Sequence, residues 1–264
     1  MTELFQARID RDVVIVDGPD ATSFLQSLLS QDLDPVAVGE AVHALLLQPQ
    51  GKLLVDLRAA RVAADTWWCV CEGGFGSVLA DGLSRFKIRV KVDVRVEPVK
   101  ALFVRGALPP AVDGAVVVPV GWGVEIVGSE GEVAALADIP VCDDDAYERA
   151  RIEAGVPRQG YDTDERTIPQ EAGLESDAVS FTKGCFVGQE LVCRIDTRGH
   201  VNRSLRRLRA DAPVARGASV ERDGKAVGEV TSSAGDVALA MIRREVEPGA
   251  TVTVDGVRAT VESR

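Results

Sequence analysis

The chain contains 264 residues, 46% of them hydrophobic and 27% charged, which fits two or three compact domains with buried cores. Its net charge of −11 argues against a global surface for nucleic acid, although local basic patches occur at 84–91 and 198–209. No apolar run approaches the roughly 18 residues of a membrane span. Five cysteines without regular spacing, and a start that lacks the features of a secretory signal, predict a cytoplasmic protein in a reducing compartment.

The first elements along the chain are expected to be a short apolar strand that ends at Gly18 and a helix that follows it. Pro19 suits the first turn of that helix, where its missing N–H costs nothing. Apolar residues at helical spacing predict a buried stripe made of Phe24, Leu25, Leu28 and Leu29. Strands are then expected at 41–48, 52–63 and 66–71, with a hairpin turn at 49–52.

A second helix is expected around residues 75–86. It would offer four apolar side chains to the core: Val78, Leu79, Leu83 and Phe86. Residues 88–98 alternate apolar with charged side chains, which predicts a strand with one side in solvent. The order strand, helix, strands, helix, strand predicts a ferredoxin-like lobe over residues 10–97.

The middle of the chain reads as a second, looser lobe over residues 98–203, with a short helix expected at 130–139. A stronger helix is expected within 143–157, because acidic residues begin it and Pro157 forbids its continuation. The segment 156–183 has few periodic apolar positions, and long irregular segments of this kind are usually functional. Residues 204–264 alternate short strands with turns, which predicts a small antiparallel barrel or sandwich.

The stretch "FTKGCFVGQELVCRI" (181–195) places Cys185 at the junction between a loop and a helix. Backbone N–H groups and Lys183 would favour the thiolate there, and Gly184 and Gly188 would allow a tight turn or a close approach to a ligand. The alternative is a small hydrophobic side chain that packs in a glycine-rich turn. Cys193 is either a resolving partner or a core residue.

The remaining reactive residues give weaker signals. No pair of cysteines has the Cys-x-x-Cys spacing, and the chain has two histidines, so we expect no metal site built by this chain alone. His43 lies in an apolar strand, where a hydrogen-bonded core histidine is the simplest interpretation. No nucleophile-elbow, P-loop or Rossmann pattern occurs.

The segment "YDTDERTIPQEAG" (161–173) is rich in carboxylates, which a solvated loop would explain. Glu171, however, follows Pro169 closely and is therefore a candidate for a rigidly held carboxylate. Such a group can accept two parallel N–H bonds from a cyclic amidine, such as that of a pterin or guanine ring.

The motif "KGCFVGQE" resembles the signature of the YgfZ-type folate-binding proteins of iron–sulfur cluster assembly and repair. These proteins are relatives of the glycine cleavage system T-protein, a tetrahydrofolate-dependent aminomethyltransferase. Three further stretches resemble the same family: "GPDATSFLQSLLSQDL", "LLLQPQGKLLVDL" and "RIEAGVPRQGYDTDERTIPQEAGL". The resemblance implies an α+β fold of two intertwined ferredoxin-like lobes and a C-terminal antiparallel β-barrel, arranged as a three-lobed ring. It also implies that residues 1–9 join the second lobe.

The resemblance further implies a site for tetrahydrofolate in the central hole. It assigns Cys185 and Lys183 to chemistry, and the folate to Glu171, Asp56, Gly184 and Gln189. Asp56 matches one member of the aspartate pair of the T-protein, and Val55 stands where the other would be. Phe186 replaces a commoner tyrosine.

Three functions follow as alternatives. The first is a folate-binding protein that supports iron–sulfur cluster assembly or repair and the enzymes that depend on it, such as tRNA-modifying ones, with Cys185 beside the folate. The second is a folate-dependent aminomethyl or one-carbon transferase of the T-protein type, and the third is a folate-binding scaffold without thiol chemistry. The expected partners are folate and iron–sulfur client or assembly proteins, with no direct contact to nucleic acid or a membrane. The chain is expected to be a monomer.

Overall fold

The computed structural model describes residues 3–264, except 108–111, 113, 130–132, 134–135 and 137. The chain divides into two compact units, which are described separately. The first unit contains Met1–Cys142 and Glu175–Leu191, and the second contains Asp143–Leu174 and Val192–Arg264. The lobe boundaries expected from the sequence stay predictions. Most of the helix expected at 130–139 lies outside the described residues. Within the described part of the chain, no helix is both long and apolar enough to cross a membrane.

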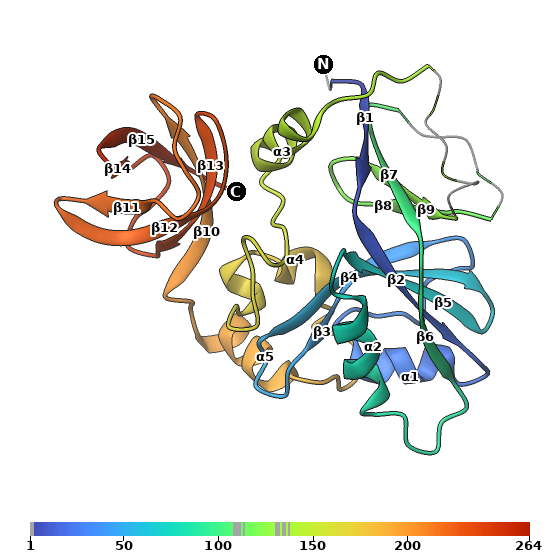
Figure 1. Cartoon of the computed structure of the whole chain (residues 1–264). Coiled ribbons are helices and arrows are strands. Elements are labelled where there is room, and N and C mark those ends of the chain that lie inside the picture. Colours follow the sequence, from blue (N-terminus) through green and yellow to red (C-terminus); the bar gives the residue numbers. More distant parts are fainter. Residues whose placement is uncertain (1–2, 108–111, 113, 130–132, 134–135, 137) are drawn as a thin grey trace. The chain divides into compact units, whose positions relative to one another are not determined.

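The first unit contains a five-stranded antiparallel sheet in the order β3-β4-β5-β2-β6 (Figure 1). Its strands are β2 (Arg11–Asp17), β3 (Ala41–Leu47), β4 (Leu53–Ala63), β5 (Thr66–Glu72) and β6 (Asp93–Glu97). The helices α1 (Ala21–Leu28) and α2 (Gly76–Ser84) contribute apolar side chains to the same core. The predicted order of strand, helix, strands, helix and strand is therefore confirmed, as is the buried stripe of α1.

Three details of this region were predicted wrongly. Pro19 lies in the turn that precedes α1 and not in the first turn of the helix. The second helix ends at Ser84, and Phe86 lies beyond it with 41% of its surface exposed; Val78 is also exposed. The strand expected from residue 88 begins only at Asp93. Leu79 and Leu83 are buried as expected. The alternation of residues 88–92 therefore belongs to a loop and not to a strand.

A second sheet of the first unit has the order β1-β7-β9-β8. Its strands are β1 (Phe5–Ile9), β7 (Lys100–Arg105), β8 (Val116–Pro119) and β9 (Val124–Gly128). The N-terminal strand β1 pairs with β7, in antiparallel register from Phe5–Arg105 to Ile9–Ala101. The short helix α4 (Glu175–Ala178) and the start of α5 (Gln189–Arg198) complete the unit.

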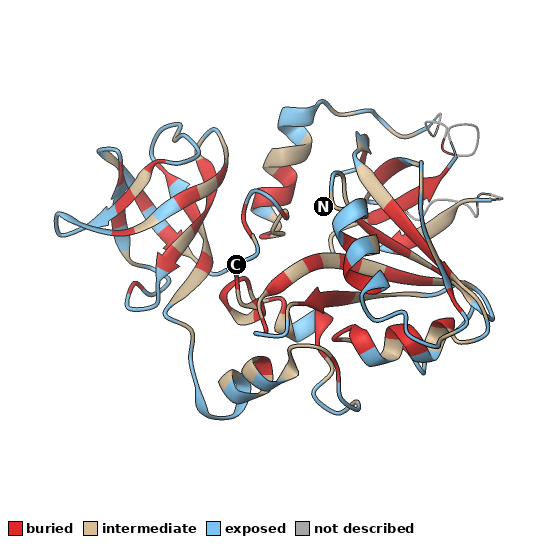
Figure 2. Cartoon of the chain, turned by 60° about the horizontal axis from the view of Figure 1, so that its bottom comes forward, coloured by how far each residue is buried: buried red, intermediate tan, exposed pale blue. Residues whose placement is uncertain are grey.

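The second unit is dominated by a closed barrel in the order β10-β13-β12-β11-β14-β15. Its strands are β10 (Arg203–Ala210), β11 (Ser219–Arg222), β12 (Lys225–Ala234), β13 (Val237–Arg243), β14 (Thr251–Val254) and β15 (Val257–Glu262). Pairing of β10 with β15 closes the barrel and removes its open edges. Figure 2 shows buried residues along these strands. The α+β class and the antiparallel C-terminal barrel are thus confirmed.

Local sequence signals explain the ends of several elements of the second unit. Asp143 caps the helix α3 (Asp144–Glu153), because its side chain accepts a hydrogen bond from Ala146 N at 2.8 Å. Two hairpins of the barrel turn at Asp-Gly pairs in which Asp223 and Asp255 have positive φ angles of 53° and 47°. The helix expected within 143–157 is confirmed, as are turns between the strands of residues 204–264.

Candidate functional site

The signature loop, residues 183–188, packs against the turn of the β3–β4 hairpin. Gly188 has a φ angle of +80°, and a Cβ atom there would lie 2.5 Å from the carbonyl oxygen of Gln48. Gly51, in the hairpin turn, has a φ angle of +76°, and its Cβ would lie 2.9 Å from the oxygen of Gly188. Both positions therefore require glycine, because two backbones touch where any side chain would collide. This contact fixes the loop to a rigid sheet.

Cys185 lies at the outer side of this loop and is exposed, whereas Phe186 is buried. A Cβ atom on Gly184 would meet no atom within 4 Å, so the space beside the cysteine is open. Helix α5 begins at Gln189, whose Oε1 accepts from Phe186 N at 3.2 Å. The predicted position of Cys185 at a loop-to-helix junction is confirmed. A thiol in this place is accessible to a partner or a small molecule.

Lys183 holds the start of the signature loop against the C-terminal end of α1. Its Nζ donates to the carbonyl oxygens of Gln26 at 2.7 Å and of Leu29 and Gln31 at 2.8 Å each. Burial lowers the pKa of Lys183 to about 8, although Asp32 and Asp34 act in the opposite direction. The ammonium therefore satisfies carbonyls that a helix end leaves without partners. Its role in thiol chemistry stays a prediction.

Substitution Lys183→Met is expected to lower the free energy of unfolding by about 1.5–3 kcal/mol, since the charged hydrogen bonds are lost and several carbonyls lose their donor. Urea unfolding followed by circular dichroism measures this loss. Lys100→Met is the matched control: Lys100 is exposed, so its loss is expected to stay within about 0.5 kcal/mol. Equal effects of the two substitutions would contradict the capping role.

Asp56 lies on β4 within a network of charged groups in the first unit. Its Oδ1 is 2.6 Å from Nε2 of His43 and 3.4 Å from Nη1 of Arg58. His43 and Arg58 are register partners on β3 and β4. Desolvation by burial raises the pKa of Asp56, but His43, Arg58 and Arg11 lower it more, so the pKa lies below its ordinary value. The carboxylate is therefore held ionised.

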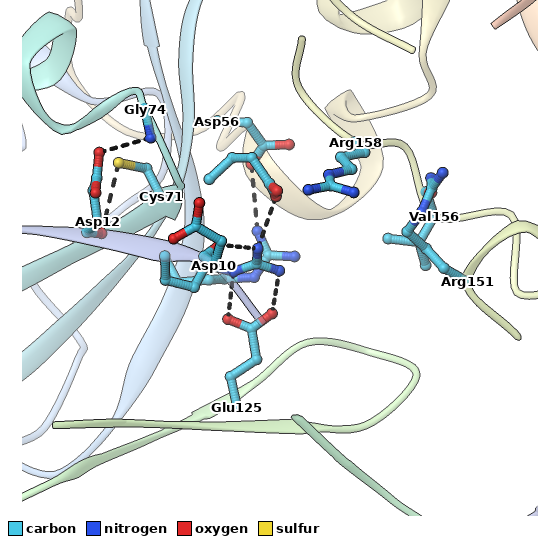
Figure 3. A network of polar contacts seen from close by, with 12 residues as sticks. Asp10, Asp12, Asp56, Cys71, Gly74, Glu125, Arg151, Val156 and Arg158 are labelled. Carbon is cyan, nitrogen blue, oxygen red and sulfur yellow. Dashed lines mark hydrogen bonds and ion pairs between the residues drawn. The ribbon is translucent and has the colours of Figure 1, made fainter. Parts of the chain in front are cut away.

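Arg11 connects this network to the second sheet. Its guanidinium binds both carboxylate oxygens of Glu125 on β9, at 2.7 and 3.0 Å, and Glu72 on β5 at 2.8 Å. Figure 3 shows Asp56 and Glu125 within one set of polar contacts. Arg11 and Glu125 were missed from the sequence. The available signal was the single charged residue, Glu125, in the otherwise apolar strand β9.

Glu171 lies in the second unit, in a short 3-10 helix (Pro169–Glu171), and is 7% exposed. Arg203 binds its carboxylate with two N–H groups, at 2.8 and 3.2 Å, and Ile168 N donates to it at 3.0 Å. The carboxylate is thus held rigidly, as Pro169 suggested. Cys185 lies in the first unit, so a chamber shared by Cys185 and Glu171 stays a prediction.

The other cysteines differ from Cys185 in exposure. Burial raises the pKa of Cys69 to about 12 and also raises that of Cys71, so neither thiol ionises readily. Cys142 and Cys193 are half-buried. Among the described residues, no group of three or more histidine, cysteine or acidic side chains is placed to hold a metal ion.

Comparison with protein families gives two matches. Residues 12–112 match the model of the GCVT N-terminal domain, and residues 203–263 match that of the CAF17 C-terminal β-barrel domain. The first match contains the β3–β4 hairpin and Asp56, and the second contains the barrel strands.

Two kinds of named protein are similar to this chain. The iron–sulfur cluster assembly factor IBA57 of Mus musculus is 29% identical, over 92% of this chain and 78% of the relative. An aminomethyltransferase of Bordetella petrii is also 29% identical, with the same coverage of both chains. The crystal structure of the glycine cleavage aminomethyltransferase T from Bartonella henselae superposes with a TM-score of 0.86 at 22% identity, over 99% of this chain and 85% of that one. The two proteins share their fold.

Proposed function

Since this chain belongs to the GcvT-related family of the YgfZ and IBA57 type, we propose that it supports iron–sulfur cluster assembly or repair. In this proposal the protein binds tetrahydrofolate and presents the thiol of Cys185 to an iron–sulfur assembly or client protein, tRNA-modifying enzymes included. The observation that carries the proposal is the exposure of Cys185 on a loop that two glycines lock to the β3–β4 hairpin.

The proposed chemistry of Cys185 follows from its surroundings. A thiolate is a ligand for iron, and the open space beside Gly184 gives a cluster or partner access to it. One cysteine cannot hold a whole cluster, so the partner protein must supply further ligands and the cluster is cargo. Lys183 and Gly188 hold the loop in place while the thiol acts.

Tetrahydrofolate is proposed to bind Glu171. Its carboxylate accepts two N–H groups from the guanidinium of Arg203, and a pterin amidine offers the same donor pattern. The neighbouring Gln170 adds an acceptor, because its buried Oε1 has no hydrogen-bond partner within the described residues. These groups match the hydrogen-bond donors of a pterin, which takes the place of the Arg203 guanidinium at the Glu171 carboxylate. Asp56, Gly184 and Gln189 are proposed to contact other parts of the folate.

Substitution Glu171→Ala is expected to weaken tetrahydrofolate binding by roughly 1–3 kcal/mol, because a charged hydrogen-bonding partner is removed. Isothermal titration calorimetry under anaerobic conditions measures the affinity. Glu165→Ala, at an exposed position of the same segment, is expected to leave it unchanged. Unchanged affinity of the Glu171 variant, with its thermal stability intact, would remove Glu171 from the folate site.

Deletion of the gene from its source organism tests the assembly role itself. We expect the activity of an iron–sulfur enzyme such as aconitase to fall, while an enzyme without a cluster keeps its activity. Expression of the whole chain from a plasmid should restore the cluster enzyme. Equal activities in the deletion and parent strains would contradict the proposal.

The second candidate function is aminomethyl or one-carbon transfer with tetrahydrofolate. The observation that favours it is the ionised Asp56 between His43 and Arg58, on the strand that matches the GCVT domain. Val55, in the place of a second aspartate, counts against it. Activity of the chain in a reconstituted glycine cleavage assay would support this function over the first.

A further inference from the structure

The loop Arg85–Lys91, here called the basic loop, carries an unusual concentration of positive charge. It has the sequence RFKIRVK, with four cations and no acidic residue, in a chain whose net charge is −11. The loop connects α2 to β6 and projects from the five-stranded sheet (Figure 1). Residues 84–89 are all exposed. A local positive surface on an acidic protein attracts acidic partners.

Two large apolar side chains stand among these cations. Phe86 is 41% exposed and Ile88 is 74% exposed, although Val90 and Val92, further along, pack on the core. These four side chains stand at every second position, so in an extended chain they would all lie on one face. Arg89 interrupts this pattern, because its φ angle of 58° is in the left-handed region. The backbone itself thus keeps Phe86 and Ile88 in solvent.

Backbone hydrogen bonds fix the shape of the basic loop at both ends. Phe86 N donates to Leu83 O at 3.0 Å, and Lys87 N donates to Ser84 O at 3.1 Å. At the other end, Lys91 N donates to Oδ2 of Asp20 at 2.7 Å. A loop that is already ordered loses little conformational freedom when it binds.

Most of the charge of the loop is free to act on a partner. Lys87 lies 3.9 Å from Asp93, and both side chains are exposed. Within the described part of the chain, the side chains of Arg85, Arg89 and Lys91 form no ion pair or hydrogen bond. Arginine and aromatic side chains are enriched at protein interfaces, and complementary charge speeds association.

We propose that the basic loop is a docking surface for another protein, through an acidic segment that carries apolar side chains. The carboxylates of this partner segment face Arg85, Arg89 and Lys91, and its apolar side chains cover Phe86 and Ile88. An anionic membrane is a poorer occupant, because the net charge of −11 repels such a surface as a whole. A segment of another protein meets only the charges within about one Debye length, roughly 8 Å. This proposal does not depend on the folate and thiol chemistry proposed above.

The test uses the full chain and a fluorescently labelled synthetic peptide in which glutamates flank two leucines. We expect binding by fluorescence anisotropy that weakens from about 50 to about 300 mM NaCl. Replacing the leucines of the peptide by serine, at the same charge, should weaken binding further. Ile88→Asp and Arg85→Glu should each lower the affinity on the order of tenfold, since one places a like charge in the contact and the other reverses a needed charge.

Matched controls lie on other exposed sites. Val38 is 57% exposed and Arg243 has a 64% exposed side chain, so Val38→Asp and Arg243→Glu repeat the same changes outside the loop. We expect both to bind the peptide as the wild type does. No binding by the wild type, or equal binding by the Ile88 and control variants, would overturn the proposal. So would either of two other outcomes: binding to phosphatidylserine vesicles without binding to the peptide, or a dimer in light scattering that Ile88→Asp dissociates.

Discussion

Replacing Arg11 by methionine is expected to lower the free energy of unfolding by about 3–5 kcal/mol, as the loss of one partner from a buried ion pair does. The guanidinium is 13% exposed and binds Glu72 and Glu125, which are 13% and 5% exposed. Without Arg11 both carboxylates lose this guanidinium in a poorly solvated place. Urea unfolding followed by circular dichroism measures the change.

Two further variants separate the lost ion pair from a general effect of removing an arginine. Arg8 on β1 is exposed, and Arg8→Met is expected to change stability by no more than about 0.5 kcal/mol. Adding Glu125→Gln to Arg11→Met should recover part of the loss, because an unpaired charge is removed. A loss for Arg11→Met no larger than that of Arg8→Met would contradict this account of the network.

Removal of Arg151 is expected to have an effect of similar size in the second unit. Its side chain is 3% exposed and binds Asp162, which is fully buried, at 2.9 Å. The same guanidinium also binds Glu148 on α3 at 2.8 Å and Ser232 on β12 at 2.9 Å. Arg151→Met is expected to cost about 3–5 kcal/mol, because Asp162 stays buried without its charged partner.

The same helix supplies the control for Arg151. Arg149 also forms ion pairs, with Glu153 and Asp236, but its side chain is 42% exposed. Exposed pairs contribute about 0–1 kcal/mol, so Arg149→Met should have little effect in the same urea experiment. Arg151→Lys keeps the charge and loses the planar fork, and its loss should lie between the two. Equal losses for Arg149→Met and Arg151→Met would show that burial does not decide the strength of these pairs.

The elements that the sequence predicted well are those with local signals. The stripe of α1, the acidic start of α3 and the turns between the barrel strands all depend on residues within a few positions of each other. Phe86 was misplaced because periodicity cannot show where a helix stops. The turn bonds after Leu83 end α2 before Phe86 can reach the core.

The sequence motif of the candidate site could be predicted, but the contacts that its residues make could not. The resemblance pointed to Cys185, and its loop position followed from the sequence. Gly188 contacts the hairpin turn, and Lys183 donates hydrogen bonds to carbonyls at the end of α1. Both interactions join residues more than 130 positions apart in the sequence. The binding of Arg11 to Glu125, 114 residues away, is of the same kind. Such pairs depend on how the sheets and loops pack, and this packing cannot be predicted from a local sequence pattern.

The most direct test of the central claim, that the exposed thiol of Cys185 performs the function, is rescue of the deletion strain by Cys185→Ser. Aconitase activity is measured at equal levels of expressed protein, with Cys193→Ser as the control, since Cys193 is half-buried on α5. We expect the Cys193 variant to restore activity and the Cys185 variant to leave it at the level of the deletion. Full rescue by Cys185→Ser would contradict the claim.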